Sequence, residues 1–129
     1  MTNKFCKEER LCNRKSIEFL FSAEDKVKFT EFPLLVIAKE VAEDEQKFPA
    51  KMMVSVSKRK IKLAVNRNLM KRRIKEAYRL HKNDFYEALQ SQNKQLILCF
   101  IFLGNKPVPY QLIEEKIIVL LKRLTEQSV

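Results

Sequence analysis

The sequence predicts one α+β domain, with a small mixed β-sheet packed against about three helices in the order α-β-β(-β)-α-β-α. A chain of 129 residues is long enough for a single hydrophobic core and too short for two. Hydrophobic residues make up 46% and charged residues 33%, which is the balance of a folded protein. Segments with helical and strand patterns follow one another without an internal repeat. We therefore treat residues 1–129 as one domain, and expect residues 1–8 to be flexible and 126–129 to form a tail.

The N-terminal part predicts a short helix and then a strand. Ile17, Leu20 and Phe21 have the i, i+3, i+4 spacing of a helix over about residues 13–23. Asn13 or Ser16 could cap it. The apolar stretch "FPLLVIAKEV", residues 32–41, predicts a strand, and the acidic "AEDEQ" after it predicts a loop.

A second strand is predicted over "KMMVSVS", residues 51–57, because its residues alternate in character. Small hydroxyl side chains on one face would leave room for the backbone of a ligand. One face carries Met52, Val54 and Val56, and the other carries Met53, Ser55 and Ser57.

The C-terminal half predicts helix, strand and helix. Residues 64–81 contain no Pro or Gly and form a long helix, and residues 83–92 form a second helical piece. The unbroken apolar run over 95–103 is typical of a strand buried on both faces. The last helix, over 110–127, is amphipathic. Its apolar face consists of Ile113, Ile117, Leu120, Leu121 and Leu124.

Positive charge is concentrated in the middle of the chain. The net charge is +10, yet residues 51–82 alone hold twelve Lys or Arg and a single acid, Glu76. The other residues hold fourteen bases and fifteen acids. A charge added for solubility would be spread over the chain, so this block indicates a surface that binds a polyanion.

The block lies mostly on one side of the predicted helix. At 100° per residue, seven polar residues fall within about 140°. Arg73 instead falls on the apolar side, where it must extend to the edge or find a buried partner. The polar ridge consists of Arg67, Asn68, Lys71, Arg72, Lys75, Arg79 and Lys82.

Two other interpretations of the ridge are less favourable. A helix face that is merely solvated usually mixes Glu with Lys at i, i+4, and acids are almost absent here. A helix lying on an anionic membrane needs free bulky apolar residues, and these are needed for the core. The Arg content favours bidentate recognition of phosphate.

The remaining features point to a cytoplasmic protein without an active site of its own. No apolar run approaches the ~20 residues of a membrane span, and the charged N-terminus does not resemble a secretory signal. Three cysteines without CxxC spacing predict reduced thiols, two exposed and one buried. The single His, His81, is better explained as a structural residue than as a general base, and we expect no catalytic residue and no metal ligand in the chain.

The stretch "SVSKRKIKLAVNRNLMKRRIKEAYR", residues 55–79, resembles the signature of the bacterial ribonuclease P protein subunit. That family has an S-V-S-K strand end followed by A-V-x-R-N-x-x-K-R on a helix. The flanking order of elements is also similar, so the resemblance extends over about residues 8–125. It implies a ribosomal protein S5 domain 2-like fold. The matching positions are Ser55, Val56, Ser57, Lys58, Ala64, Val65, Arg67, Asn68, Lys71 and Arg72.

The chain departs from the family pattern in three places. Leu69 stands where the family usually has Arg, and Lys62-Leu63 precede Ala64 where it has Gly-Asn, with one extra residue after Lys58. In the first helix the two positions that are commonly aromatic hold Ile17 and Phe21.

The resemblance implies a protein cofactor of an RNA enzyme that removes the 5′ leader of precursor tRNA, with the chemistry done by the RNA subunit and Mg²⁺. The partners implied are the catalytic RNA and precursor tRNA, with neither DNA nor a membrane. A cleft formed by Ile17, Phe21, Ser55 and Ser57 would hold the leader, although Phe21 could equally be a core residue. Residues expected to bind RNA are Lys58, Arg59, Lys60, Arg67, Asn68, Lys71, Arg72, Lys75 and Arg79.

Two alternatives remain open from the residues alone. One is a ribosomal or translation-factor-like RNA-binding module without a processing role. The other is a protein that binds DNA or an anionic membrane through the basic helix.

Overall fold

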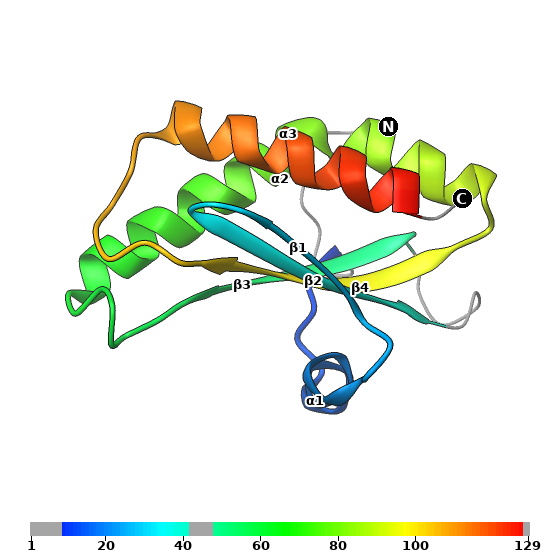
Figure 1. Ribbon diagram of the computed structural model, residues 1–129, viewed down its shortest axis with the longest axis horizontal. Coiled ribbons are helices and arrows are strands. Elements are labelled where there is room, and N and C mark those ends of the chain that lie inside the picture. Colours follow the sequence, from blue (N-terminus) through cyan, green and yellow to red (C-terminus); the bar gives the residue numbers. More distant parts are fainter. Residues whose placement is uncertain (1–8, 42–47, 128–129) are drawn as a thin grey trace.

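The structure, a computed structural model, describes residues 9–41 and 48–127. Residues 1–8, which we expected to be flexible, lie outside the described part, as does the predicted acidic loop. A four-stranded sheet forms the middle layer, with two helices on one face and one short helix on the other (Figure 1). The elements are α1 (Arg14–Ser22), β1 (Val27–Glu31), β2 (Leu34–Val41), β3 (Ala50–Val56), α2 (Ala64–Ser91), β4 (Gln95–Phe102) and α3 (Tyr110–Gln127).

The strands lie in the order β1-β2-β4-β3. β1 pairs with β2 and β2 with β4 in antiparallel fashion, whereas β3 and β4 are parallel and are joined through α2. β4 is therefore a central strand. The predicted class, a single α+β domain with three helices and a mixed sheet, is confirmed.

The predicted first helix forms, and its cap is Asn13. The Asn13 side-chain oxygen accepts hydrogen bonds from the backbone N–H groups of Lys15 at 2.9 Å and Ser16 at 3.4 Å. This satisfies N–H groups that have no partner within the helix. Leu20 is fully buried under the sheet and anchors α1 to it.

Two strand predictions need adjustment. β2 begins at Leu34, because Phe32 and Pro33 belong to the turn after β1. β1 is the optional strand of the predicted order, for which no residue range was predicted. It buries little surface and has only Val27 and Phe29 as apolar residues, so its local signal is weak.

The break predicted after His81 is wrong, because α2 is one helix of 28 residues. Asn83 does not interrupt it, and the buried face continues through Phe85, Tyr86 and Leu89. Tertiary packing thus outweighs the weak local preference of Asn and Asp for helix ends.

The sheet separates two apolar clusters, and β4 contributes to both. Leu96, Leu98, Phe100 and Phe102 face α2 and α3. Ile97, Cys99 and Ile101 face α1. The prediction that this strand is buried on both faces is confirmed, and so is the apolar face predicted for the last helix. The buried residues of α3 are Ile113, Ile117, Leu120, Leu121 and Leu124.

The end of α3, the cysteines and the hydropathy of the helices complete the description of the fold. α3 runs to Gln127, so Glu126 and Gln127 are helical, and only 128–129 of the predicted tail lie outside the described part. Cys12 is exposed and Cys99 is buried, where burial raises the pKa of its thiol. No helix within the described ranges is long and apolar enough to cross a membrane.

Candidate nucleic-acid interface

The three cations after β3 are held outward by a turn that Ser57 organises. Lys58, Arg59 and Lys60 are all exposed. The Ser57 hydroxyl accepts hydrogen bonds from the backbone N–H groups of Arg59 at 3.2 Å and Lys60 at 3.4 Å, and the Ser57 carbonyl accepts from Ile61 at 3.0 Å. The Lys60 ammonium also donates to the Leu103 carbonyl at 3.1 Å. Ser57 therefore shapes the basic turn, a role the sequence did not reveal.

The ridge on α2 continues from this turn. Asn68, Arg72 and Lys75 are exposed, and Lys71 is half-buried. On the opposite side of the helix Met70, Ile74, Ala77 and Tyr78 are fully buried. Packing of that side against the sheet and α3 fixes the direction in which the ridge faces (Figure 1).

Arg67 is half-buried and also supports the start of α2. Its Nη1 donates to the carbonyls of Ile61 and Lys62, both at 2.9 Å. The N-cap residue Leu63 offers no side-chain hydrogen bond to the helix. The guanidinium therefore ties the basic turn to the first turn of the helix, and keeps the two cationic surfaces in a fixed relation.

Arg79 is paired with the one acid of the basic block. Its Nε and Nη2 donate to the two carboxylate oxygens of Glu76 at 2.9 and 2.7 Å. These hydrogen bonds lower the pKa of Glu76, with the charge of Arg79 adding to the effect. Arg79 thus stays on the ridge with its charge partly compensated.

Two cations of α2 do not belong to the ridge. Lys82, which the helical projection placed there, is buried and pairs with Glu9. The projection was wrong at this position because the N-terminal segment, which a helical wheel cannot include, covers that part of α2. Arg73 finds a partner, as expected, by donating to the Val108 carbonyl.

The four predicted cleft residues lie on the α1 side of the sheet or at its end. Cross-strand pairing places Thr30, Leu35, Ile101 and Ser55 in one row across all four strands. Thr30 is exposed and the other three are half-buried. In the adjoining row, Ile37 and Cys99 of the two middle strands are buried beneath α1. We call the row Thr30–Leu35–Ile101–Ser55 the open row.

Helical geometry places Phe21 on the side of α1 away from Phe19. The centroid of the Phe19 ring lies 5.9 Å from the Lys39 ammonium on β2. A step of 100° per residue sets Phe21 about 200° from Phe19 and near Ile17. Ile17 is half-buried and, like Leu35 and Ile101, packs against the buried cluster that contains Leu20. Phe21 is 40% exposed, so the alternative of a buried core residue does not hold.

Sequence reasoning missed three exposed apolar residues near the basic turn. Leu63 is 64% and Val65 71% exposed at the start of α2. Phe32 is 68% exposed in the turn before β2, next to Pro33, whose carbonyl accepts from the Leu103 N–H at 2.7 Å. The Phe-Pro pair at the start of the strand predicted over residues 32–41 was the one available signal for an aromatic on a surface turn.

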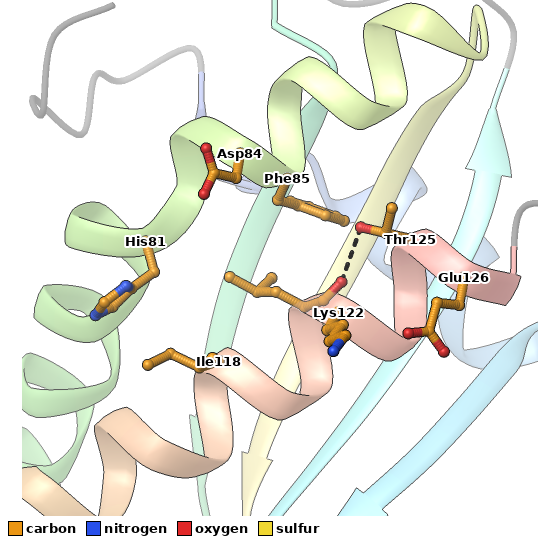
Figure 2. A pocket seen from close by; sticks show the side chains of 8 residues that line it. His81, Asp84, Phe85, Ile118, Lys122, Thr125 and Glu126 are labelled. Atoms are coloured by element: carbon orange, nitrogen blue, oxygen red, sulfur yellow. Dashed lines mark hydrogen bonds between the residues drawn. The ribbon is translucent and has the colours of Figure 1, made fainter.

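A pocket of about 430 Å³ lies between α2 and α3, lined by different residues from the ridge (Figure 2). Phe85, Ile118 and Leu121 form its apolar lining. Its charged residues are of both signs, among them Asp84, Lys122 and Glu126. This mixture does not suit a polyanion.

His81 lies at the edge of this pocket and is bonded to Glu114, with 2.9 Å between its Nε2 and Glu114 Oε2. The Glu114 oxygen also accepts from the Tyr110 hydroxyl at 3.4 Å. A satisfied histidine that bridges two helices agrees with the structural role expected from the sequence. Over residues 9–41 and 48–127, no group of three or more His, Cys, Asp or Glu is placed to hold a metal ion.

Comparison with known proteins gives one consistent result. A family model described as Ribonuclease P matches residues 5–125. A ribonuclease P protein component from Porphyromonas gingivalis is 32% identical over 108 residues, covering 84% of this chain and 77% of its own. One from Chlorobaculum tepidum is 30% identical over 105 residues, covering 78% of this chain and 68% of its own.

Solved structures agree on the fold. The structure of Staphylococcus aureus RNase P protein superposes with a TM-score of 0.70 at 19% identity, covering 90% of this chain and 94% of that one. A mutant of that protein, described as having defective mRNA degradation activity, gives a TM-score of 0.71 at 19% identity, covering 92% of this chain and 89% of that one. The chain belongs to the ribonuclease P protein family.

Proposed function

We propose that this chain is the RNA-binding cofactor of ribonuclease P and that two of its surfaces divide the work of tRNA 5′ maturation. Membership of the family supports the processing role over a ribosomal or translation-factor module. Two observations carry the division. The basic turn and α2 together present one cationic surface, and the open row lies on the face of the sheet opposite α2.

The ridge and the basic turn bind the catalytic RNA through its phosphates. Arg guanidinium groups form two parallel hydrogen bonds to a phosphate, and Lys supplies a point charge. The surface needs no rearrangement, because Ser57 and Arg67 already hold the turn and the helix together. The residues assigned to this contact are Lys58, Arg59, Lys60, Arg67, Asn68, Lys71, Arg72, Lys75 and Arg79.

The open row and the adjoining flank of α1 bind the 5′ leader. Phe21 offers an exposed ring on which a base can stack, and this contact tolerates any base. Ile17 supports the ring from α1, and Ser55 supplies a small hydroxyl on the sheet. Ser57 already accepts two backbone bonds, so its hydroxyl hydrogen is the part left to reach a phosphate oxygen.

Chemistry in this proposal belongs to the RNA subunit. In this proposal the Mg²⁺ that the reaction uses is held by RNA phosphates and by substrate. The cations of the protein screen repulsion between two polyanions, and this lowers the Mg²⁺ concentration that the RNA needs. A protein that works with tRNA precursors acts in the cytoplasm.

The experiment is reconstitution with a bacterial ribonuclease P RNA at low Mg²⁺. We expect the wild-type chain to restore leader removal and Arg72→Ala/Lys75→Ala to restore it poorly, while Lys122→Ala, a cation exposed on α3, serves as the control. Equal restoration by the ridge double variant and the control would contradict the proposal. Competition by duplex DNA at matched salt separates RNA recognition from general binding of polyanions.

A further inference from the structure

Two charged side chains are buried within the described part of the chain, and they contact each other. Glu9 is 1% and Lys82 2% exposed. The Lys82 ammonium donates to Glu9 Oε2 at 2.5 Å, and the Tyr86 hydroxyl donates to the same oxygen at 2.6 Å. The Tyr78 hydroxyl donates to Tyr86 at 3.1 Å. Two residues of α2, Lys82 and Tyr86, thus contact one carboxylate from the N-terminal segment, and Tyr78 is linked to it through Tyr86.

The network is set up so that each hydroxyl donates toward Glu9. Burial raises the pKa of Tyr86 well above its usual range, and the neighbouring Tyr78 and Glu9 raise it further. Burial likewise raises the pKa of Tyr78. Both hydroxyls therefore keep their protons, and the carboxylate has well-defined partners.

Glu9 is joined directly to the backbone that leads into α1. Two residues further on, the Leu11 N–H donates to the Met52 carbonyl at 3.0 Å, at the edge of β3. The Leu11 side chain is buried with Leu20 of α1 on the other face of the sheet. The segment therefore passes from the α2 side of the sheet to the α1 side, where α1 lies by itself (Figure 1).

A buried ion pair contributes little net stability compared with apolar residues of similar size, and its best-attested use is to fix register. Apolar contacts are non-directional, so the burial of Leu11 fixes the register of the segment along the edge of β3 less strictly than a specific charge pair does. A carboxylate that must reach Lys82 allows one register only. That register determines where Leu11, and after it α1, meets the sheet.

We propose that the Glu9–Lys82 pair is a positioning device that sets α1 over the sheet and thereby holds Ile17 and Phe21 beside the open row. The inference deepens the proposed function, because it rests on leader binding at this surface. Lys82, which burial excludes from the ridge, gains in this way a role in the recognition of precursor tRNA through α1.

The test uses three variants of the full chain: Glu9→Gln, Lys82→Met, and both together. Each single variant removes one member of the buried pair and keeps the charge of the other, so the N-terminal segment should detach. In the double variant neither charge remains, the methionine fills the space, and the amide oxygen at position 9 still accepts from Tyr86. Glu18→Gln breaks the exposed Arg14–Glu18 pair on α1 and is the matched control, because exposed pairs contribute little.

The first measurement is hydrogen exchange of the free protein. Amides of residues 11–22 should exchange roughly tenfold faster or more in the single variants, while those of β4 remain protected and show that the domain is folded. The double variant carries no uncompensated charge but also lacks the pair, so its amides over residues 11–22 should exchange more slowly than in the single variants and faster than in wild type. Glu18→Gln should match wild type. Unchanged exchange in both single variants would overturn the proposal.

The second measurement compares affinities for precursor and mature tRNA in the complex with the catalytic RNA. The preference for precursor should fall about fivefold or more in the single variants, by loss of leader stacking, and should be recovered only in part in the double variant, which lacks the pair. Affinity for the catalytic RNA should stay constant. If Lys82→Met instead weakens that affinity and reduces its salt dependence, Lys82 contacts RNA and the proposal is wrong. If wild type shows no preference for precursor, the leader assignment fails, and the exchange experiment still decides the positioning.

Discussion

Truncation of Phe21 to Ala tests the leader-binding surface most directly. Phe21 is 40% exposed and lies outside the buried cluster beneath α1, whereas its neighbour Leu20 is fully buried in that cluster. Leu20→Ala is therefore the matched control, a truncation one residue away that affects packing and not the exposed ring.

The expected magnitudes differ between the two variants. A fully buried Phe→Ala costs ~3–5 kcal/mol, and a ring that is largely at the surface leaves no closed cavity, so we expect about 1–2 kcal/mol for Phe21. On a domain of this size that lowers Tm by roughly 3–10 °C. Leu20→Ala should cost ~2–5 kcal/mol, because it leaves a cavity under the sheet.

The effects on binding of precursor tRNA should have the reverse order, with the larger loss of affinity in Phe21→Ala. Loss of one base stack is worth ~1–3 kcal/mol, so Phe21→Ala should bind precursor tRNA about five- to 150-fold more weakly and mature tRNA as wild type does. Leu20→Ala loosens the anchor of α1 but keeps the ring, so, measured well below its Tm, it should reduce the preference for precursor less than Phe21→Ala does. Phe21→Tyr keeps a stacking ring and should retain most of the preference for precursor.

The assay is thermal unfolding together with both affinities, measured on the same preparations in complex with the catalytic RNA. A large fall in Tm for Phe21→Ala, with precursor and mature tRNA equally affected, would refute the stacking assignment. The basic ridge would be untouched by that result, since it rests on other residues.

The remaining four predictions concern the charged residues and the absence of cleavage by the protein alone. Binding to the catalytic RNA should weaken with salt with a log–log slope of roughly −3 to −5, and Arg72→Ala and Lys75→Ala should each reduce its magnitude by about 1 without loss of stability; a slope near zero would contradict phosphate binding. Arg67→Ala should lower Tm as well as affinity, because Arg67 Nη1 holds two carbonyls before α2, and a variant with unchanged Tm would show that this support is dispensable. Glu76→Gln should tighten RNA binding by freeing Arg79. Because the pKa of Glu76 is lowered, its carboxylate is ionised at neutral pH and above, and the gain measured by titration at matched salt should not change between neutral and alkaline pH. The protein alone should cleave nothing and should lower the Mg²⁺ requirement of the RNA, and nuclease activity in an RNA-free preparation that a point mutation abolishes would overturn this.

The sequence by itself determined the elements whose signal is local. Periodicity is enough to identify α3 and its buried face, and an unbroken apolar run is enough to identify a central strand such as β4. The basic block and the motif over residues 55–79 likewise depend on spacing along one segment. They identified the family and the ridge before any contact was known.

Tertiary structure decided what depends on contacts between distant segments. Lys82 has the sequence pattern of a ridge cation, yet it is buried because Glu9, 73 residues away, lies over it. The length of α2 beyond His81 and the roles of Arg67 and Ser57 were equally hidden, since each depends on partners outside the local pattern. Phe21 could be placed at the surface only once Leu20 was seen to fill the space under the sheet. A helical projection gives the angle of a side chain about its own axis, and burial is fixed by whatever other part of the chain packs at that angle.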